Sequence, residues 1–163
     1  MMFKEECMTL VSSKEFGLCD DEKHPPAYVD LDNKDAWIAR VINPSEHEIE
    51  FYALDQCADI RDANNNLVSV CDAVLHTRRA LYFVELKDRK SKGWRGNAIQ
   101  QLKSTLKIYF ITKNSQLDKK NIKCYASNKQ KPAAPNSNFG PIIAFKKETG
   151  CMLYQTAEIL IES

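Results

Sequence analysis

The chain has 163 residues, 44% of them apolar, which is enough for one ordinary domain with a core of its own. No apolar run is long enough to cross a membrane, and the first residues lack the apolar stretch of a signal peptide, so we expect a cytoplasmic protein with no membrane partner. The net charge is only +1, but residues 1–55 carry −8 and residues 56–163 carry +9. A polyanion is therefore expected to bind the C-terminal two thirds.

Residues 1–42 are predicted to form an N-terminal arm or helical segment without an assignable role. They are rich in Asp and Glu, and residues 35–41 predict one or two helical turns that end before the Asn43-Pro44 pair. The rest of the chain, residues 43–163, is expected to form the functional domain.

Two strands joined by an asparagine-rich turn come next. Apolar and polar residues alternate in residues 47–59, which predicts a strand, and residues 67–75 predict its antiparallel partner. A turn centred on Asn64 would place Cys57 across from Cys71. Because the six cysteines form no C-x-x-C pair and a reducing compartment is expected, we predict that these two are small buried thiols rather than a disulfide.

Residues 80–88 predict a third strand, apolar on both faces along its central run, after a short polar turn. A hairpin centred between positions 78 and 79 would place Asp72 directly opposite Glu85, with Cβ atoms roughly 4.5–5.5 Å apart. Side chains alternate along a strand, so Glu85 shares its face with Lys87. Two carboxylates and one lysine are therefore expected to converge.

This trio predicts a divalent-metal site. Carboxylate oxygens suit Mg²⁺ or Mn²⁺, and magnesium is usually held by one or two carboxylates, with waters and substrate phosphate completing its shell. Asp72 and Glu85 are the expected ligands, and Lys87 would orient or deprotonate the attacking water or neutralise charge on phosphorus. The competing interpretation is a solvated Glu85/Lys87 pair on an edge strand with no chemical role.

Residues 95–112 carry apolar residues at helical spacing and predict an amphipathic helix. Gln101 borders its apolar face and Gln100 lies farther round, so one of them is expected to turn toward Glu85. The basic connection before the helix is expected to grip phosphate, with Trp94 stacking on a base, or else Trp94 attaches the start of the helix to the core. The predicted nucleic-acid contacts are Arg89, Lys90, Lys92, Trp94, Arg95 and Lys103.

Residues 121–127 predict a fourth strand, parallel to the third because a helix connects the two. Residues 139–149 predict a helix closed by Gly150, and residues 151–161 predict a final strand. This order of elements predicts an α/β fold with a mixed β-sheet of about five strands and helices on both faces.

One stretch of the sequence resembles the PD-(D/E)xK nuclease superfamily. The resemblance is carried by Asp72, twelve intervening residues, Glu85-Leu86-Lys87 and a following helix with Gln100 and Gln101, while cysteine stands where the motif has proline, at position 71. In families of this type, a glutamine on that helix often helps to position metal, water or substrate, which implies this role for Gln100 or Gln101.

The resemblance implies a restriction-endonuclease-like core in residues 43–163. It also implies hydrolysis of phosphodiester bonds that depends on Mg²⁺ or Mn²⁺, with DNA favoured over RNA as the substrate. The alternative is a catalytically inactive module that keeps the scaffold and binds nucleic acid or a protein partner. The partners considered beside nucleic acid are a second copy of the chain, in a homodimer, and another protein.

Overall fold

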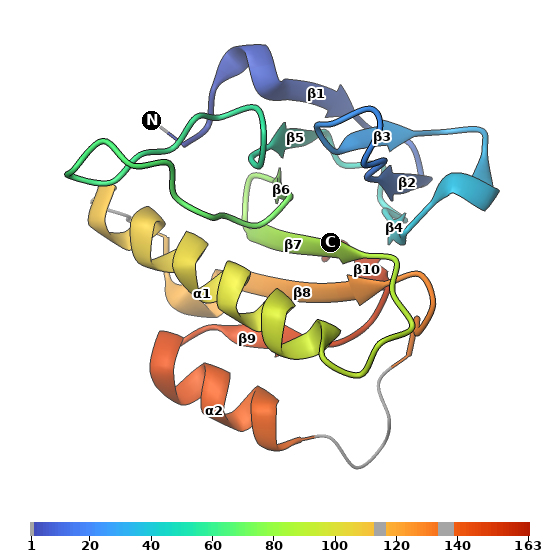
Figure 1. Ribbon diagram of the computed structural model, residues 1–163. Helices are drawn as coiled ribbons and strands as arrows, with labels where there is room; N and C mark the ends of the chain where they lie inside the picture. The colour runs from blue at the N-terminus through green and yellow to red at the C-terminus, as the bar shows by residue number, and fades with distance from the viewer. Residues whose placement is uncertain (1, 113–116, 134–138) are drawn as a thin grey trace.

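Two helices and two packed sheets make up the three layers of the computed structural model, which describes residues 2–112, 117–133 and 139–163 (Figure 1). The central layer is a six-stranded mixed sheet in the order β1 (Met8–Val11), β5 (Ile49–Ala53), β6 (Ala73–His76), β7 (Leu81–Lys87), β8 (Ile122–Asn128) and β9 (Met152–Tyr154). The second sheet has the order β10 (Glu158–Leu160), β4 (Ala39–Ile42), β2 (Glu15–Cys19) and β3 (Tyr28–Asp30). The helices are α1 (Trp94–Thr112) and α2 (Gly140–Thr149), and three short 3-10 turns are η1 (Glu5–Cys7), η2 (Lys34–Ala36) and η3 (Lys119–Asn121).

The β6–β7 hairpin has the predicted register. Ala73 pairs with Val84, and the same ladder continued by one residue sets Asp72 opposite Glu85. Strand β8 runs parallel to β7, and α1 forms the connection between them, as the sequence predicts. Helix α2 also ends as predicted, at Gly150, whose φ of +77° suits a residue without a side chain. The α/β class and the mixed sheet are therefore confirmed.

The two faces of the six-stranded sheet are covered differently. Leu81 and Phe83 of β7 pack into the core formed with the helices, and the alternate residues Tyr82 and Val84 pack into the core formed with the second sheet. Both helices lie on the same side of the six-stranded sheet in Figure 1. The prediction of helices on both faces is therefore wrong, because apolar side chains of the second sheet cover the other face: Phe16, Leu18, Val41, Ile159 and Ile161.

The N-terminal segment is built into both sheets. Strand β1 pairs with β5 at one edge of the six-stranded sheet, and β2, β3 and β4 form most of the second sheet. The helical turns expected in residues 35–41 are reduced to η2, and the chain becomes a strand from Ala39 onward. Alternating burial explains this difference, because Ala39 and Val41 face the core while Arg40 is exposed.

The final strand predicted for residues 151–161 is two strands instead. Strand β9 extends the six-stranded sheet beside β8, and β10 pairs in parallel with β4 in the second sheet. The chain leaves one sheet and enters the other between Tyr154 and Glu158. A single continuous strand cannot serve two stacked sheets, so the prediction of one strand is wrong.

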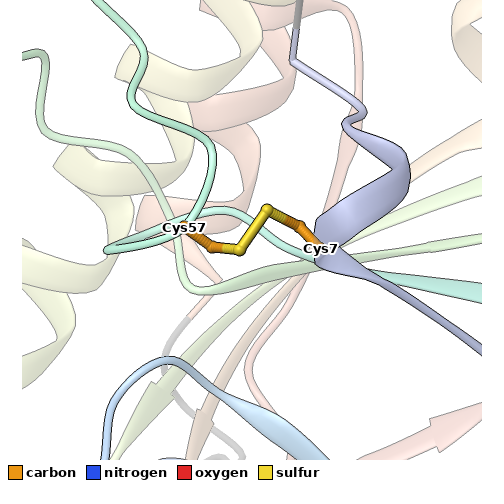
Figure 2. Close-up of a disulfide and its surroundings, with 2 residues drawn as sticks. All are labelled: Cys7 and Cys57. Carbon is orange, nitrogen blue, oxygen red and sulfur yellow. A yellow bond between two sulfur atoms is a disulfide. The ribbon is translucent and has the colours of Figure 1, made fainter.

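The cysteine prediction fails in part. The turn centred on Asn64 is present as a bridge between Arg61 and Leu67, but β5 pairs with β6 in a register displaced by two residues from the predicted one, with Ala53 opposite Ala73. Cys57 forms a disulfide with Cys7 instead (Figure 2). Gln56 has a φ of +60°, and the Cys57 N–H donates to the Leu54 carbonyl, so a tight turn takes Cys57 out of the ladder. Cys71 is a buried free thiol, as predicted. Within the described residues, no helix is both long and apolar enough to cross a membrane.

Candidate functional site

Asp72, Glu85 and Lys87 lie together where β6 begins and β7 ends. Asp72 and Glu85 are only 6% and 4% exposed, and both line one cavity with Lys87. The Leu86 N–H donates to Asp72 Oδ2 at 2.7 Å, which fixes the aspartate against the neighbouring strand. Lys87 Nζ lies 3.5 Å from Glu85 Oε1 and donates to Asn97 Oδ1 of α1 at 2.8 Å. The solvated edge pair that competed with the metal site is excluded by this burial and by the central position of β7.

The two carboxyl groups are electrostatically strained. Burial raises the pKa of Glu85 well above its ordinary value, and the Asp72 charge raises that pKa further, whereas Lys87 lowers it. Burial also raises the pKa of Asp72, while a hydrogen bond with the Glu85 carboxyl group and a second one from the Leu86 N–H lower it. A buried pair of acids this close cannot carry two charges cheaply, so the pair holds a proton or requires a cation.

One oxygen of the pair receives no hydrogen bond from an N–H or hydroxyl group. Among the described residues, no such group donates to Glu85 Oε2, although this atom is buried. The two carboxyl groups share a hydrogen bond when one of them is protonated. An unsatisfied buried acceptor costs on the order of 1–3 kcal/mol, and more when it is charged, so the pair is stabilised either by a shared proton or by a ligand that supplies positive charge.

The cavity above the pair has a volume of about 750 Å³. Segments from both sheets and the β7–α1 connection form its walls. Its lining holds three basic residues, Lys23, Lys87 and Arg89, against seven acids: Asp20, Asp21, Glu22, Asp55, Asp72, Glu85 and Asp88. Four acids of the N-terminal third, residues 20–22 and Asp55, thus line the same cavity as the basic Lys87 and Arg89 from the C-terminal part.

Asp20 and Asp55 are site residues that the sequence did not reveal. Burial raises the pKa of Asp20, and the charge of Asp55 raises it further; the pKa of Asp55 is also raised by burial. Both contribute to the raised pKa of Asp72. Asp20 directly follows β2, and Asp55 follows β5 after one residue. An acid just beyond an apolar strand was the available signal, but the sequence did not show that the two strand ends meet.

The donor set fits a hard divalent cation with two protein ligands. Within the part of the chain that the structure describes, no three His, Cys, Asp or Glu side chains are grouped to hold a metal ion. Magnesium, however, is often held by one or two carboxylates together with waters and substrate phosphate. Asp72 and Glu85 satisfy this smaller requirement, because Glu85 Oε2 receives no hydrogen bond from an N–H or hydroxyl group of the described residues.

The two glutamines of α1 are placed differently. Gln101 is half-buried, lines the cavity and accepts a hydrogen bond of 2.5 Å from Ser69 Oγ. Gln100 is exposed and does not line the cavity. Gln101 is therefore the glutamine that the fold brings to the Asp72/Glu85 side, held by its bond to Ser69.

The structure places the residues of the predicted nucleic-acid surface in different environments. Trp94 is 4% exposed and packs in the core, so the prediction that it stacks on a base is wrong, and the alternative, that it attaches the helix start to the core, is correct. The Arg95 guanidinium lies 5.3 Å from the centre of the Trp94 ring, and Lys103 forms a 2.7 Å ion pair with Glu148 of α2. The residues that stay exposed for phosphate are Arg89, which lines the cavity, Lys90 and Lys92.

The fold and site define a buried carboxylate pair with an adjacent lysine, at the floor of an acidic cavity between two sheets. Comparisons with protein-family models, curated proteins and solved structures found no match.

Proposed function

We propose that the protein is a divalent-metal-dependent nuclease that hydrolyses phosphodiester bonds. The observation that carries this proposal is the Asp72/Glu85 pair: two buried acids with raised pKa values, one oxygen without an N–H or hydroxyl donor, and Lys87 beside them. A bound cation would stabilise two buried carboxylates more than water would. The PD-(D/E)xK-like spacing of these residues also supports a metal-dependent nuclease.

Asp72 and Glu85 would hold Mg²⁺ or Mn²⁺, which when bound polarises a phosphoryl oxygen and activates water. Lys87 has three N–H donors, of which one is used by Asn97 and another faces Glu85. The third remains for a water or a phosphate oxygen, so Lys87 positions the nucleophile and offsets charge that develops on phosphorus. Gln101, fixed by Ser69, would orient a water or the substrate from the helix side.

The acidic lining explains why such an enzyme would need metal for binding as well as for chemistry. Seven acids against three basic residues repel a phosphate chain unless cations compensate. Arg89 lines the cavity, and the exposed Lys90 and Lys92 follow it in the connection between β7 and α1, so these three of the predicted residues would contact phosphate.

A catalytically inactive binding module is the second candidate. It is favoured by one observation: among the described residues, no third acidic or histidine side chain completes a metal cluster. In that case, the same scaffold and its basic connection would bind nucleic acid or a protein partner without cleaving it.

The deciding experiment is a cleavage assay on the purified protein. Plasmid, linear duplex, single-stranded DNA and RNA are each incubated with Mg²⁺, Mn²⁺ or a chelator. Wild type is compared with Asp72→Asn and with Glu48→Gln, a matched change at an exposed acid outside the cavity. Metal-dependent cleavage that Asp72→Asn removes and Glu48→Gln keeps supports the nuclease. If the wild-type protein cleaves no substrate with any metal, the nuclease proposal is wrong and the binding module becomes the proposed function.

A further inference from the structure

One wall of the cavity is apolar and aromatic, unlike its acidic floor. Tyr28, at the start of β3, lines the cavity and is 40% exposed. Pro25, Pro26 and Ala27, which lead into β3, line the cavity beside it, and so does Ile38. An exposed tyrosine in an apolar wall is therefore in the same cavity as the carboxylate pair.

This combination matches the two parts of a nucleotide. The floor suits a phosphate bridged by a cation, and the face of an exposed tyrosine suits a planar base. Stacking of a base on an aromatic side chain contributes about 1–3 kcal/mol per base. A base in the interior of a duplex has both faces covered by its neighbours and offers none to Tyr28, whereas an unpaired base can turn a face toward it.

The size and charge of the cavity favour the same class of ligand. Its volume of about 750 Å³ lies in the range of small-molecule pockets, which is room for one or two nucleotides and not for a turn of duplex. The scissile phosphate would have to reach Asp72 and Glu85, which are almost fully buried. Along its axis a duplex carries twice the charge density of one strand, so the acidic residues that line the cavity disfavour it more.

We propose, as an extension of the proposed nuclease function, that the cavity takes single-stranded nucleic acid, with an unpaired base stacked on Tyr28 and the adjoining phosphodiester at Asp72 and Glu85. Tyr28 is then a specificity residue that selects unpaired strands. Pro25 and Pro26 confine the base from the same wall.

The test measures binding and cleavage separately. Binding of a fluorescently labelled phosphorothioate oligonucleotide, which resists hydrolysis, is followed by anisotropy in Mg²⁺, as a single strand and as the matched duplex. Wild type is compared with Tyr28→Ala, with Tyr28→Phe, which keeps the ring, and with Leu31→Ala, an exposed apolar residue that does not line the cavity. Thermal unfolding of each variant confirms that it folds.

The single strand should bind more tightly than the duplex, and Tyr28→Ala should weaken single-strand binding roughly 5- to 150-fold, with Tyr28→Phe and Leu31→Ala within about twofold of wild type. Equal binding of the duplex, an unaffected Tyr28→Ala variant, or displacement by a free mononucleotide as effective as by the strand would overturn the inference. If the protein cleaves duplex faster than single strands and Tyr28→Ala does not change the rate, the nuclease proposal holds and the proposed selectivity for unpaired strands is wrong. If single-strand binding depends on Tyr28 but no substrate is cleaved, the single-strand site holds and the nuclease proposal is wrong.

Discussion

The Leu86 N–H donates to Asp72 Oδ2 at 2.7 Å, so the strand that carries Glu85 and Lys87 also orients the third member of the site. This bond comes from the backbone. Substitution of the Glu85 or Lys87 side chain therefore leaves the anchor of Asp72 in place, and the effects of such variants report on charge and chemistry more than on displacement of the aspartate.

Lys87→Ala separates chemistry from metal binding. The substitution removes the cation but keeps both carboxylates, so metal affinity should be retained while cleavage falls by a factor on the order of 10² or more. Asp72→Asn should weaken metal binding and cleavage together, because one anionic ligand is lost. Calorimetric titration with Mn²⁺ and cleavage rates measure the two effects, with the exposed Lys107→Ala as the control. If cleavage survives both substitutions, the site lies elsewhere.

The stability of the metal-free protein should depend on pH through Glu85. Its raised pKa means that the folded state keeps a proton that the unfolded chain releases above about pH 4.3. The free energy of unfolding linked to this proton is greatest at pH values below the ordinary pKa of a glutamate. It falls as the pH rises toward the pKa of Glu85 in the folded state, by about 1.4 kcal/mol for each pH unit within that interval. The charged neighbours that shift the pKa of Glu85 are Asp72, which raises it, and Lys87, which lowers it. Asp20 and Asp55 line the same cavity.

Glu85→Gln removes this titration, and the variant should therefore gain stability relative to wild type between about pH 5 and pH 8 in the presence of a chelator. Urea unfolding at several pH values measures the difference. Added Mg²⁺ should reverse the order by stabilising only the wild type. Parallel stability profiles for the two proteins would show that Glu85 is ionised in the folded state without metal.

Trp94→Ala tests the buried position of this side chain. Loss of a core tryptophan should lower the free energy of unfolding by about 3–5 kcal/mol, because it removes apolar burial and leaves a cavity. Ile111→Ala, at an exposed position of the same helix, should change it by less than about 0.5 kcal/mol. An unchanged stability for Trp94→Ala, together with weaker binding of nucleic acid, would restore the stacking role predicted from the sequence.

The Cys7–Cys57 disulfide can be tested by counting the free thiols of the denatured protein. Protein denatured without reductant should expose four reactive thiols, Cys19, Cys71, Cys124 and Cys151, and protein treated with reductant should expose six. Mass spectrometry after alkylation distinguishes the two. Six labelled cysteines without reductant would return Cys57 to the free thiol predicted from the sequence.

The sequence correctly predicted those parts of the fold whose contacts join segments close together along the chain. The register of β6 and β7 follows from a short polar turn between two apolar runs, and the parallel β8 follows from the helix between it and β7. The second sheet could not be derived in this way, because β3 and β10 have only three residues each, too few to show a period. Its parallel pair joins Arg40 to Glu158, far apart along the chain.

The same limit applies to the site. Asp72, Glu85 and Lys87 are placed by one hairpin and were recoverable from its register. Asp55 joins them through the pairing of β5 with β6 in the same sheet, whereas Asp20, at the end of β2, joins them only after the two sheets have packed. Trp94 was ambiguous for a related reason. Its sequence neighbours are basic, and only the packing of α1 against the core decides that the ring points inward.

The Cys7–Cys57 disulfide closes the chain into a covalent ring, with a sequence separation of 50 between its ends. Asp20, Tyr28 and Asp55 lie within that ring, and Asp72, Glu85 and Lys87 lie outside it. A protease that cut once in the exposed stretch 21–25 would therefore leave the two pieces of chain linked, and they would separate on a gel only after reduction. The wall of the cavity can be opened at one peptide bond without being lost from the protein.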